Sequence, residues 1–279
     1  MLTLELDHVG VAVRSLDRGR DAYAKLGFTL AARSIHSGSR VPGGPVEVWG
    51  SGNHCAMFHE GYLEIIGLTD PNTYSSVKPM VERYEGLHIV AIGVSPPGPT
   101  VTVDAAREEL LANGVPVEAP RSLERDATFG PKDEQVRRAK FRNCYLDREK
   151  YAEARFLYIQ HLTRDVIWQP HLLEHANGAV AMEEAWFCSE DAAATRARLE
   201  PVFPSPVRGR FRVVAPGEWP FRPLPPLPSP VAFGVRVNSL SRTRAHLASQ
   251  GIPVVEDQGA VWVSPDHACG SAIRFFERN

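Results

Sequence analysis

The sequence has 279 residues, of which 43% are hydrophobic and 23% are charged, so a packed core is expected and disorder is not. This length suits one large domain or two ordinary ones. The formal net charge of −2 gives no electrostatic reason to expect a nucleic-acid or anionic membrane partner.

Membrane and targeting segments are not expected from the sequence. Apolar runs stay well short of the roughly 20 residues that span a bilayer, and the first residues, MLTLELDHVG, lack a basic start followed by an apolar stretch. The four cysteines are far apart and form no CxxC pair, which is typical of free thiols in the cytosol. We therefore expect a cytoplasmic protein.

One unit recurs along the chain: a strand, a helix and then further strands. In the first copy, Ser15 is a candidate helix cap and Gly27 a candidate helix stop. The same copy then continues into a hairpin that turns near Glu60 and Gly61. The strand–helix starts of the four copies read LDHVGVAV–SLDRGRDAYAKLG, LHIVAIGV–VDAAREELLANG, AVAMEEAWF–DAAATRARLEPVF and VAFGVRV–SLSRTRAHLASQG.

Strands that follow strands within each unit favour an α+β fold with mostly antiparallel sheets. Two stretches break the rhythm. Residues 118–135 are highly charged and predict an insertion loop, whereas residues 215–230 are rich in proline and predict an extended connection. We place a boundary between the two halves near residue 165, which gives domains of residues 1–165 and 166–279.

Two histidines and two polar strand residues occupy matching places in the first two units. His8 and His88 each open the first strand of their unit, and Glu64 and Gln160 each lie on its last strand. If the two units pair about a pseudo-twofold axis, these side chains can converge on one cleft. Imidazole with carboxylate suits a divalent first-row metal, and an ionised glutamate within an apolar strand needs such a partner.

Three stretches carry a resemblance to a known family: LDHVGVAVRSLDRGRDAYAKLGF, NHCAMFHEGYLEIIG and GLHIVAIGV. They resemble the vicinal oxygen chelate superfamily, and within it the glyoxalase-like branch. The resemblance implies four βαβββ modules that pair into two cupped, mixed or antiparallel sheets. It also implies that His8, Glu64, His88 and Gln160 are the metal ligands, with zinc, nickel, manganese, cobalt or iron as the metal.

Gln160 departs from the pattern of glyoxalase I-like enzymes, in which a glutamate is common at this place. Glutamine can coordinate a metal weakly but cannot act as a general base. Glu64 and His54 are therefore the candidate catalytic residues, with an ordinary turn residue as the alternative for His54. His161 faces away from Gln160 in a regular strand, and a bulge would exchange the two.

The second half lacks the histidines that open the third and fourth modules of extradiol dioxygenases. We interpret it as a metal-free structural half that shapes a pocket or mediates dimerisation, so a homodimer is possible.

The resemblance implies a metal-dependent enzyme for a small oxygen-chelating substrate, with isomerase, lyase or epimerase chemistry through an enolate or oxyanion. One alternative is a metal-free small-molecule binding or resistance protein of the same fold. Another is a non-haem iron dioxygenase, because His8, His88 and Glu64 resemble a facial triad.

Overall fold

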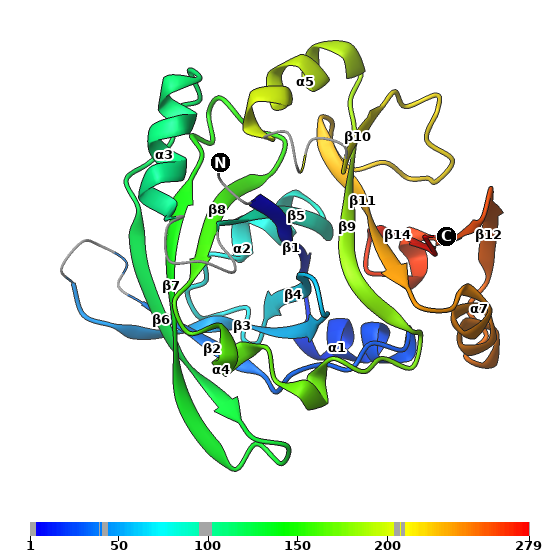
Figure 1. The fold of residues 1–279 in the computed structure, drawn as a ribbon, viewed down its shortest axis with the longest axis horizontal. Coiled ribbons are helices and arrows are strands. Elements are labelled where there is room, and N and C mark those ends of the chain that lie inside the picture. Colours follow the sequence, from blue (N-terminus) through cyan, green and yellow to red (C-terminus); the bar gives the residue numbers. More distant parts are fainter. Residues whose placement is uncertain are drawn as a thin grey trace.

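Two mixed β-sheets form the protein in a computed structural model that describes residues 4–38, 40, 44–94, 102–203, 207 and 210–278 (Figure 1). Within these residues, the first sheet has eight strands in the order β2-β3-β4-β1-β5-β8-β7-β6. The second has six, in the order β10-β9-β11-β14-β13-β12. The α+β fold with two mixed sheets confirms the prediction from the sequence.

The first sheet is assembled from two equivalent modules that meet where β1 and β5 pair antiparallel. Each module closes with its last strand parallel to its first, since β4 pairs with β1 and β8 with β5. The first module comprises β1 (Leu4–Val13), α1 (Leu16–Lys25), β2 (Ser34–Gly38), β3 (Glu47–Met57) and β4 (Tyr62–Leu68). After α2 (Lys78–Arg83), the second comprises β5 (Gly86–Val94), α3 (Val103–Ala112), β6 (Arg121–Phe129), β7 (Gln135–Tyr145) and β8 (Arg155–His161).

The second sheet repeats this plan incompletely. The third module has one described strand after its helix, and a proline-rich segment follows in place of further strands. After α4 (Arg164–Ile167) and the 3₁₀ helix η1 (Pro170–Leu172), it comprises β9 (Ala179–Cys188), α5 (Ala192–Leu199), η2 (Glu200–Val202) and β10 (Phe211–Val214). The fourth comprises β11 (Ser229–Val237), α7 (Leu240–Ser249), β12 (Val254–Asp257), β13 (Ala260–Val263), η3 (Pro265–His267) and β14 (Ala272–Phe276).

Local sequence signals set the ends of the module helices. The side chain of Ser15 accepts a hydrogen bond from the backbone N–H of Arg18 and caps α1, as the sequence predicts. Gly27, just after this helix, has φ +93°, a left-handed conformation that favours glycine. α5, which carries no such glycine, continues directly into η2.

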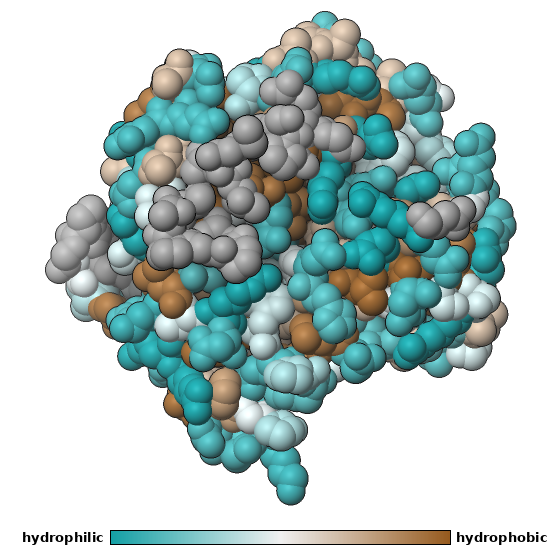
Figure 2. Space-filling view, in the orientation of Figure 1, coloured by the Kyte–Doolittle hydropathy of each residue, from teal (hydrophilic) through white to brown (hydrophobic). Residues whose placement is uncertain are grey.

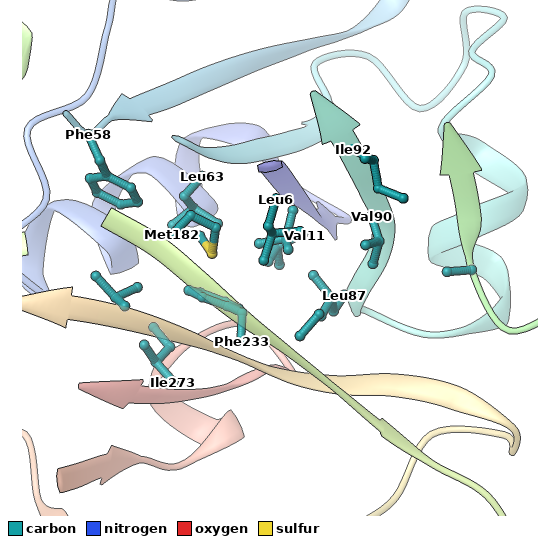
Figure 3. Close-up of a cluster of buried hydrophobic side chains, with 14 of the residues drawn as sticks. Leu6, Val11, Phe58, Leu63, Leu87, Val90, Ile92, Met182, Phe233 and Ile273 are labelled. Atoms are coloured by element: carbon teal, nitrogen blue, oxygen red, sulfur yellow. The ribbon is translucent and has the colours of Figure 1, made fainter. Parts of the chain in front are cut away.

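The two sheets bury a shared apolar core between the faces of their central strands. Figure 3 shows Leu6, Val90 and Ile92 of the first sheet in one apolar cluster with Met182 and Phe233 of the second. All five side chains are almost completely buried. Because this core runs across both halves, the boundary near residue 165, which lies between β8 and β9, stays a prediction as a domain limit.

The opposite face of the second sheet is covered by the proline-rich segment of residues 215–228, which we call the strap. Trp219 and Phe221 of the strap pack on Trp262 of β13, with ring centroids 5.7 and 6.0 Å away. Trp186 of β9 also packs on Trp262, at 5.3 Å. The strap therefore covers this face of the second sheet with aromatic side chains. The corresponding face of the first sheet carries polar groups instead.

The charged stretch of residues 118–135 is not the loop that we predicted. It forms β6 and the turn into β7, in a hairpin that projects from the sheet and whose surface is mainly hydrophilic (Figures 1 and 2). Cross-strand pairs of opposite charge support it, for example Asp126 with Arg138 at 3.1 Å. Most side chains of β6 are exposed, so its sequence lacks the alternation of apolar and polar residues by which a strand is predicted.

In the described parts of the chain, no helix combines the length and apolar character required to cross a membrane.

We expect Trp219→Ala to lower the free energy of unfolding by about 3 kcal/mol, because it empties an aromatic site in which Trp219 is only 5% exposed. Val255→Ala in β12, where the side chain is 51% exposed, serves as the control and should change it by about 0.5 kcal/mol or less. Urea denaturation measures both. Equal losses in the two variants would show that the strap does not stabilise the second sheet.

Candidate functional site

The face of the first sheet that points away from the shared core carries the candidate site, and we call it the cup. Its apolar lining comes from several strands of the sheet, with α2 and the α4–η1 segment packed against it. A pocket in the cup is lined by polar and sulfur-containing groups together with aliphatic side chains. These residues are Ala31, Ala32, Ser34, Asn53, Cys55, Met57, Arg125, Ala127, Thr128, Val166, Ile167, Gln169 and Leu172.

A bulge in β1 brings two titratable residues into the cup together. The register with β5 shifts between Leu6 and His8, so Asp7 is the extra residue. The carboxylate of Asp7 lies 2.7 Å from Nδ1 of His8. It also lies 3.1 Å from Nε2 of His161, on β8. One buried carboxylate thus joins two imidazoles, and the His8 ring stacks on Tyr62 at 4.3 Å.

The charge of Asp7 is stabilised by its two histidine partners. Complete burial by itself would raise the pKa of this carboxyl group, because desolvation disfavours the charged form. The hydrogen bonds and positive potential of His161 and His8 outweigh burial and hold the pKa well below its ordinary value. Asp7 therefore remains a carboxylate that fixes the orientation of both rings.

Glu64 also lies in the cup, two residues along β4 from Tyr62. Its Oε1 accepts a hydrogen bond of 2.5 Å from Nδ2 of Asn53, on β3. Burial raises the pKa of the nearby Cys55 thiol to about 12, and the charge of Glu64 adds to this effect. Cys55 is therefore a protonated, unreactive thiol at neutral pH. Arg125, from β6, hydrogen-bonds to the Ser34 hydroxyl across the pocket.

Gln160 does not face the cup, which corrects its predicted place beside Glu64. β8 alternates regularly, and Gln160 shares a face with Phe156 and Tyr158, whose side chains belong to the shared core. Its Oε1 accepts a hydrogen bond of 3.2 Å from the backbone N–H of Val103, at the start of α3. By the same alternation, His161 points into the cup, so no bulge in β8 is needed.

His88 lies in the cup but apart from His8. It is the extra residue of a second β1–β5 bulge, and Ala91, not His88, stands opposite His8. Its Nε2 lies 3.0 Å from the backbone carbonyl of Tyr84, on whose ring it stacks. Burial, with a smaller contribution from nearby arginines, lowers the pKa of His88 to about 4, against the effect of this hydrogen bond.

His54 belongs to the opposite face of β3 and is not placed to act as a base in the cup. It alternates with Asn53 and Cys55, which line the pocket. Its Nδ1 lies 2.9 Å from the backbone carbonyl of Ala31, and its Nε2 is buried without a partner among the described residues. The alternative offered by the sequence, an ordinary turn residue, does not hold either, because His54 lies within β3.

The predicted metal ligands do not converge on one point. Among the residues that the structure describes, no group of three or more histidine, cysteine, aspartate or glutamate residues could hold a metal ion. Gln160 is on the far face, Glu64 is bonded to Asn53, and the charges that act on the His88 ring are those of three arginines. Positive neighbours disfavour a cation, so these four residues do not fit a divalent metal as they stand.

Asp7 is a functional candidate to which the sequence does not point, and His161 is one that the sequence offers only as a substitute for Gln160 in a bulged strand. The Asp-His pair in LDHVG was visible, but a regular strand would have put Asp7 and His8 on opposite faces. Only the bulge places them together. The sequence offers Asn53, in NHCAMF, as a possible pocket group, and the structure places it in the pocket lining and in contact with Glu64 across β3 and β4.

Comparisons with known proteins agree with this architecture. A family model described as a glyoxalase-like domain matches residues 6–203. A 4-hydroxymandelate synthase mutant from Streptomyces coelicolor matches with a TM-score of 0.61 and 12% identity, over 100% of this chain and 94% of the other. A hypothetical protein from Staphylococcus aureus matches with a TM-score of 0.59 and 14% identity, over 99% and 100%. No curated protein matches the sequence. At these low sequence identities, the matches show that the folds are similar and carry no further conclusion.

We expect Gln160→Ala to lower the free energy of unfolding by about 1 kcal/mol, because the first turn of α3 loses a partly buried hydrogen-bond acceptor. The metal content per chain, measured by mass spectrometry after incubation with zinc or manganese, should not differ from that of the wild type. Loss of bound metal with unchanged stability would contradict the position of Gln160 on the far face.

We expect Asp7→Asn to lower the free energy of unfolding at pH 7 by about 3 kcal/mol, because two buried imidazoles lose their charged partner. The folded-state pKa of Asp7 lies below its unfolded value, so this stabilisation is present above about pH 4 and is lost as the pH falls further. Denaturation curves from pH 7 to pH 3 should therefore show the two proteins converging. A constant difference would contradict the pairing.

Proposed function

The chain belongs to the glyoxalase-like domain family, within the vicinal oxygen chelate superfamily, and from this premise we propose that it is an enzyme. The cup would bind a small substrate through a carbonyl oxygen and move a proton at the neighbouring carbon. Isomerase, epimerase and lyase reactions share this first step. The observation that carries the proposal is the buried Asp7–His8 pair on the cup side of β1.

The geometry of this pair is that of an oriented general base. With Asp7 at Nδ1, the basic lone pair of His8 is at Nε2, which has no hydrogen bond within the described residues. In the proposed step the C–H bond breaks, the proton passes to His8 Nε2, and the electron pair moves onto the carbonyl oxygen as an enolate. Asp7 stabilises the imidazolium that forms, without itself taking the proton.

Polar groups near the pocket can serve the rest of the reaction. The guanidinium of Arg125 and the amide of Asn53 line it and can hold a negative oxygen. Glu64 is the second acid or base of the proposal, positioned by its bond to Asn53. Return of the proton to the same carbon gives epimerisation, return to another carbon gives isomerisation, and loss of a neighbouring group gives a lyase reaction.

We do not propose the metal-dependent form of this chemistry, nor the iron dioxygenase. Both need His8, Glu64 and His88 to meet at one cation, and within the described residues no three side chains of this kind form a group that could hold a metal ion. The arginines around His88 also oppose a positive ion there. Each step above uses side chains of the chain alone.

A small-molecule binding protein is the second candidate. The pocket walls contributed by Met57, Val166, Ile167 and Leu172 are aliphatic, and such a lining favours binding of an apolar molecule without chemistry. A binding protein has no need of an oriented base, so proton exchange separates the two functions.

We expect the wild-type protein to exchange the α-protons of at least one compound in a panel of 2-oxo acids, 3-oxo acids and 2-hydroxy ketones. Proton NMR in D2O follows the loss of the α-proton signal. His8→Asn should slow this exchange by about a hundredfold or more, because general-base catalysis is worth that much. His54→Asn, a buried histidine on the opposite face, is the matched control and should exchange at about the wild-type rate.

Equal exchange rates in the wild type and in His8→Asn would overturn the role of His8. Binding of panel compounds without exchange by any of them would favour the small-molecule binding protein instead.

A further inference from the structure

A second pocket lies at the end of the cup beneath α2, away from the Asp7–His8 pair. It has a volume of about 230 Å³. Its walls come from α2, from the start of β5, and from the connection between β7 and β8. They consist of Met80, Arg83, His88, Arg148, Tyr151, Ala152, Glu153, Ala154 and Arg155.

The charged groups of this pocket are predominantly basic. Arg155 pairs with β5 through its backbone, but the guanidinium groups of Arg148 and Arg155 make no hydrogen bond or ion pair with any residue that the structure describes. Arg83 is occupied, because it donates to the carbonyls of Ala152, Pro226 and Pro228 and to the Ser229 hydroxyl. Glu153 is the one carboxylate in the lining, and its Oε1 is held by Arg198. The pocket thus keeps a net positive charge.

Arg155 is the least expected of these groups. It is a partly buried guanidinium on β8, and a buried charge without a partner is costly. Burial lowers the pKa of Arg155 most, and the like charge of Arg148 acts in the same direction, while Tyr145 and Glu64 oppose this shift without cancelling it. An anion between Arg148 and Arg155 would remove both penalties at once.

We propose that this pocket binds an oxyanion, a phosphate or carboxylate group, between the guanidinium groups of Arg155 and Arg148. Guanidinium groups bind both kinds of oxyanion through paired, charge-assisted hydrogen bonds. The pocket volume is below the range typical of drug-sized ligands, so it suits a small anion or one acidic end of a longer molecule.

The pocket is also held in place by the second half of the chain. Arg83 reaches the strap at Pro226 and Pro228, and Arg198 of α5 reaches Glu153. These contacts fix one wall of the pocket and neutralise its one carboxylate. The second half therefore contributes to this site through the strap and α5. This contribution does not require a separate pocket in the second half.

The test is isothermal titration calorimetry of the full chain at low ionic strength, with inorganic phosphate in one arm and malonate in the other. We expect saturable binding in at least one arm, and the tighter arm assigns the group. Arg155→Met should weaken it by about tenfold or more, and Arg148→Met by about threefold or more, because each removes charge-assisted hydrogen bonds. Arg244→Met, an exposed arginine that pairs with Glu256 in the second half, should leave affinity within about twofold.

His8→Asn should bind the oxyanion as tightly as the wild type. The anion site and the catalytic role of His8 are therefore tested independently of each other. If Arg155→Met does not fold, Arg155→Lys replaces it and should weaken binding severalfold, because lysine lacks the planar fork. Absence of binding in both arms, or equal weakening by Arg244→Met, would overturn the proposal.

Discussion

The shared apolar core between the two sheets decides which face of each strand is available for chemistry. β1 and β5 bury one face against β9 and β11, and the side chains on that face are almost fully removed from water. Burial of apolar surface is the dominant stabilising term in folding, so this constraint outweighs the preferences of single polar residues. Gln160 shows the effect, because β8 alternation assigns it to the buried face and α3 satisfies its side chain.

The remaining faces of the two sheets differ, although both halves follow one plan. The first keeps a cup lined by histidine, carboxylate, amide and guanidinium groups. On the second, Trp219 and Phe221 of the strap pack against Trp262 and fill the corresponding face. The third module lacks described strands where the strap runs, so the same segment both replaces sheet and covers it. One half is thereby equipped for polar chemistry and the other for stability.

Two bulges in the β1–β5 pair set the character of the cup. The first aligns Asp7 with His8 and His161, which orients both imidazole rings. The second turns His88 toward Tyr84 and the arginines, out of register with His8. A bulge adds one residue and reverses the alternation beyond it. These two irregularities separate the acid–base chemistry of the proposal from a four-ligand metal centre.

The sequence by itself determined the elements whose signals are local: the strand–helix–glycine units, the cap at Ser15, the stop at Gly27 and the family of the fold. It also identified His8 and Glu64 as polar residues on cup-forming strands. It did not determine which residues meet, because a bulge changes strand parity without a clear local signature. Only the tertiary structure brought His161 to Asp7, turned Gln160 away and surrounded His88 with arginines. These outcomes depend on strand register and on which face the second sheet covers, and both are set by contacts between residues far apart in the chain.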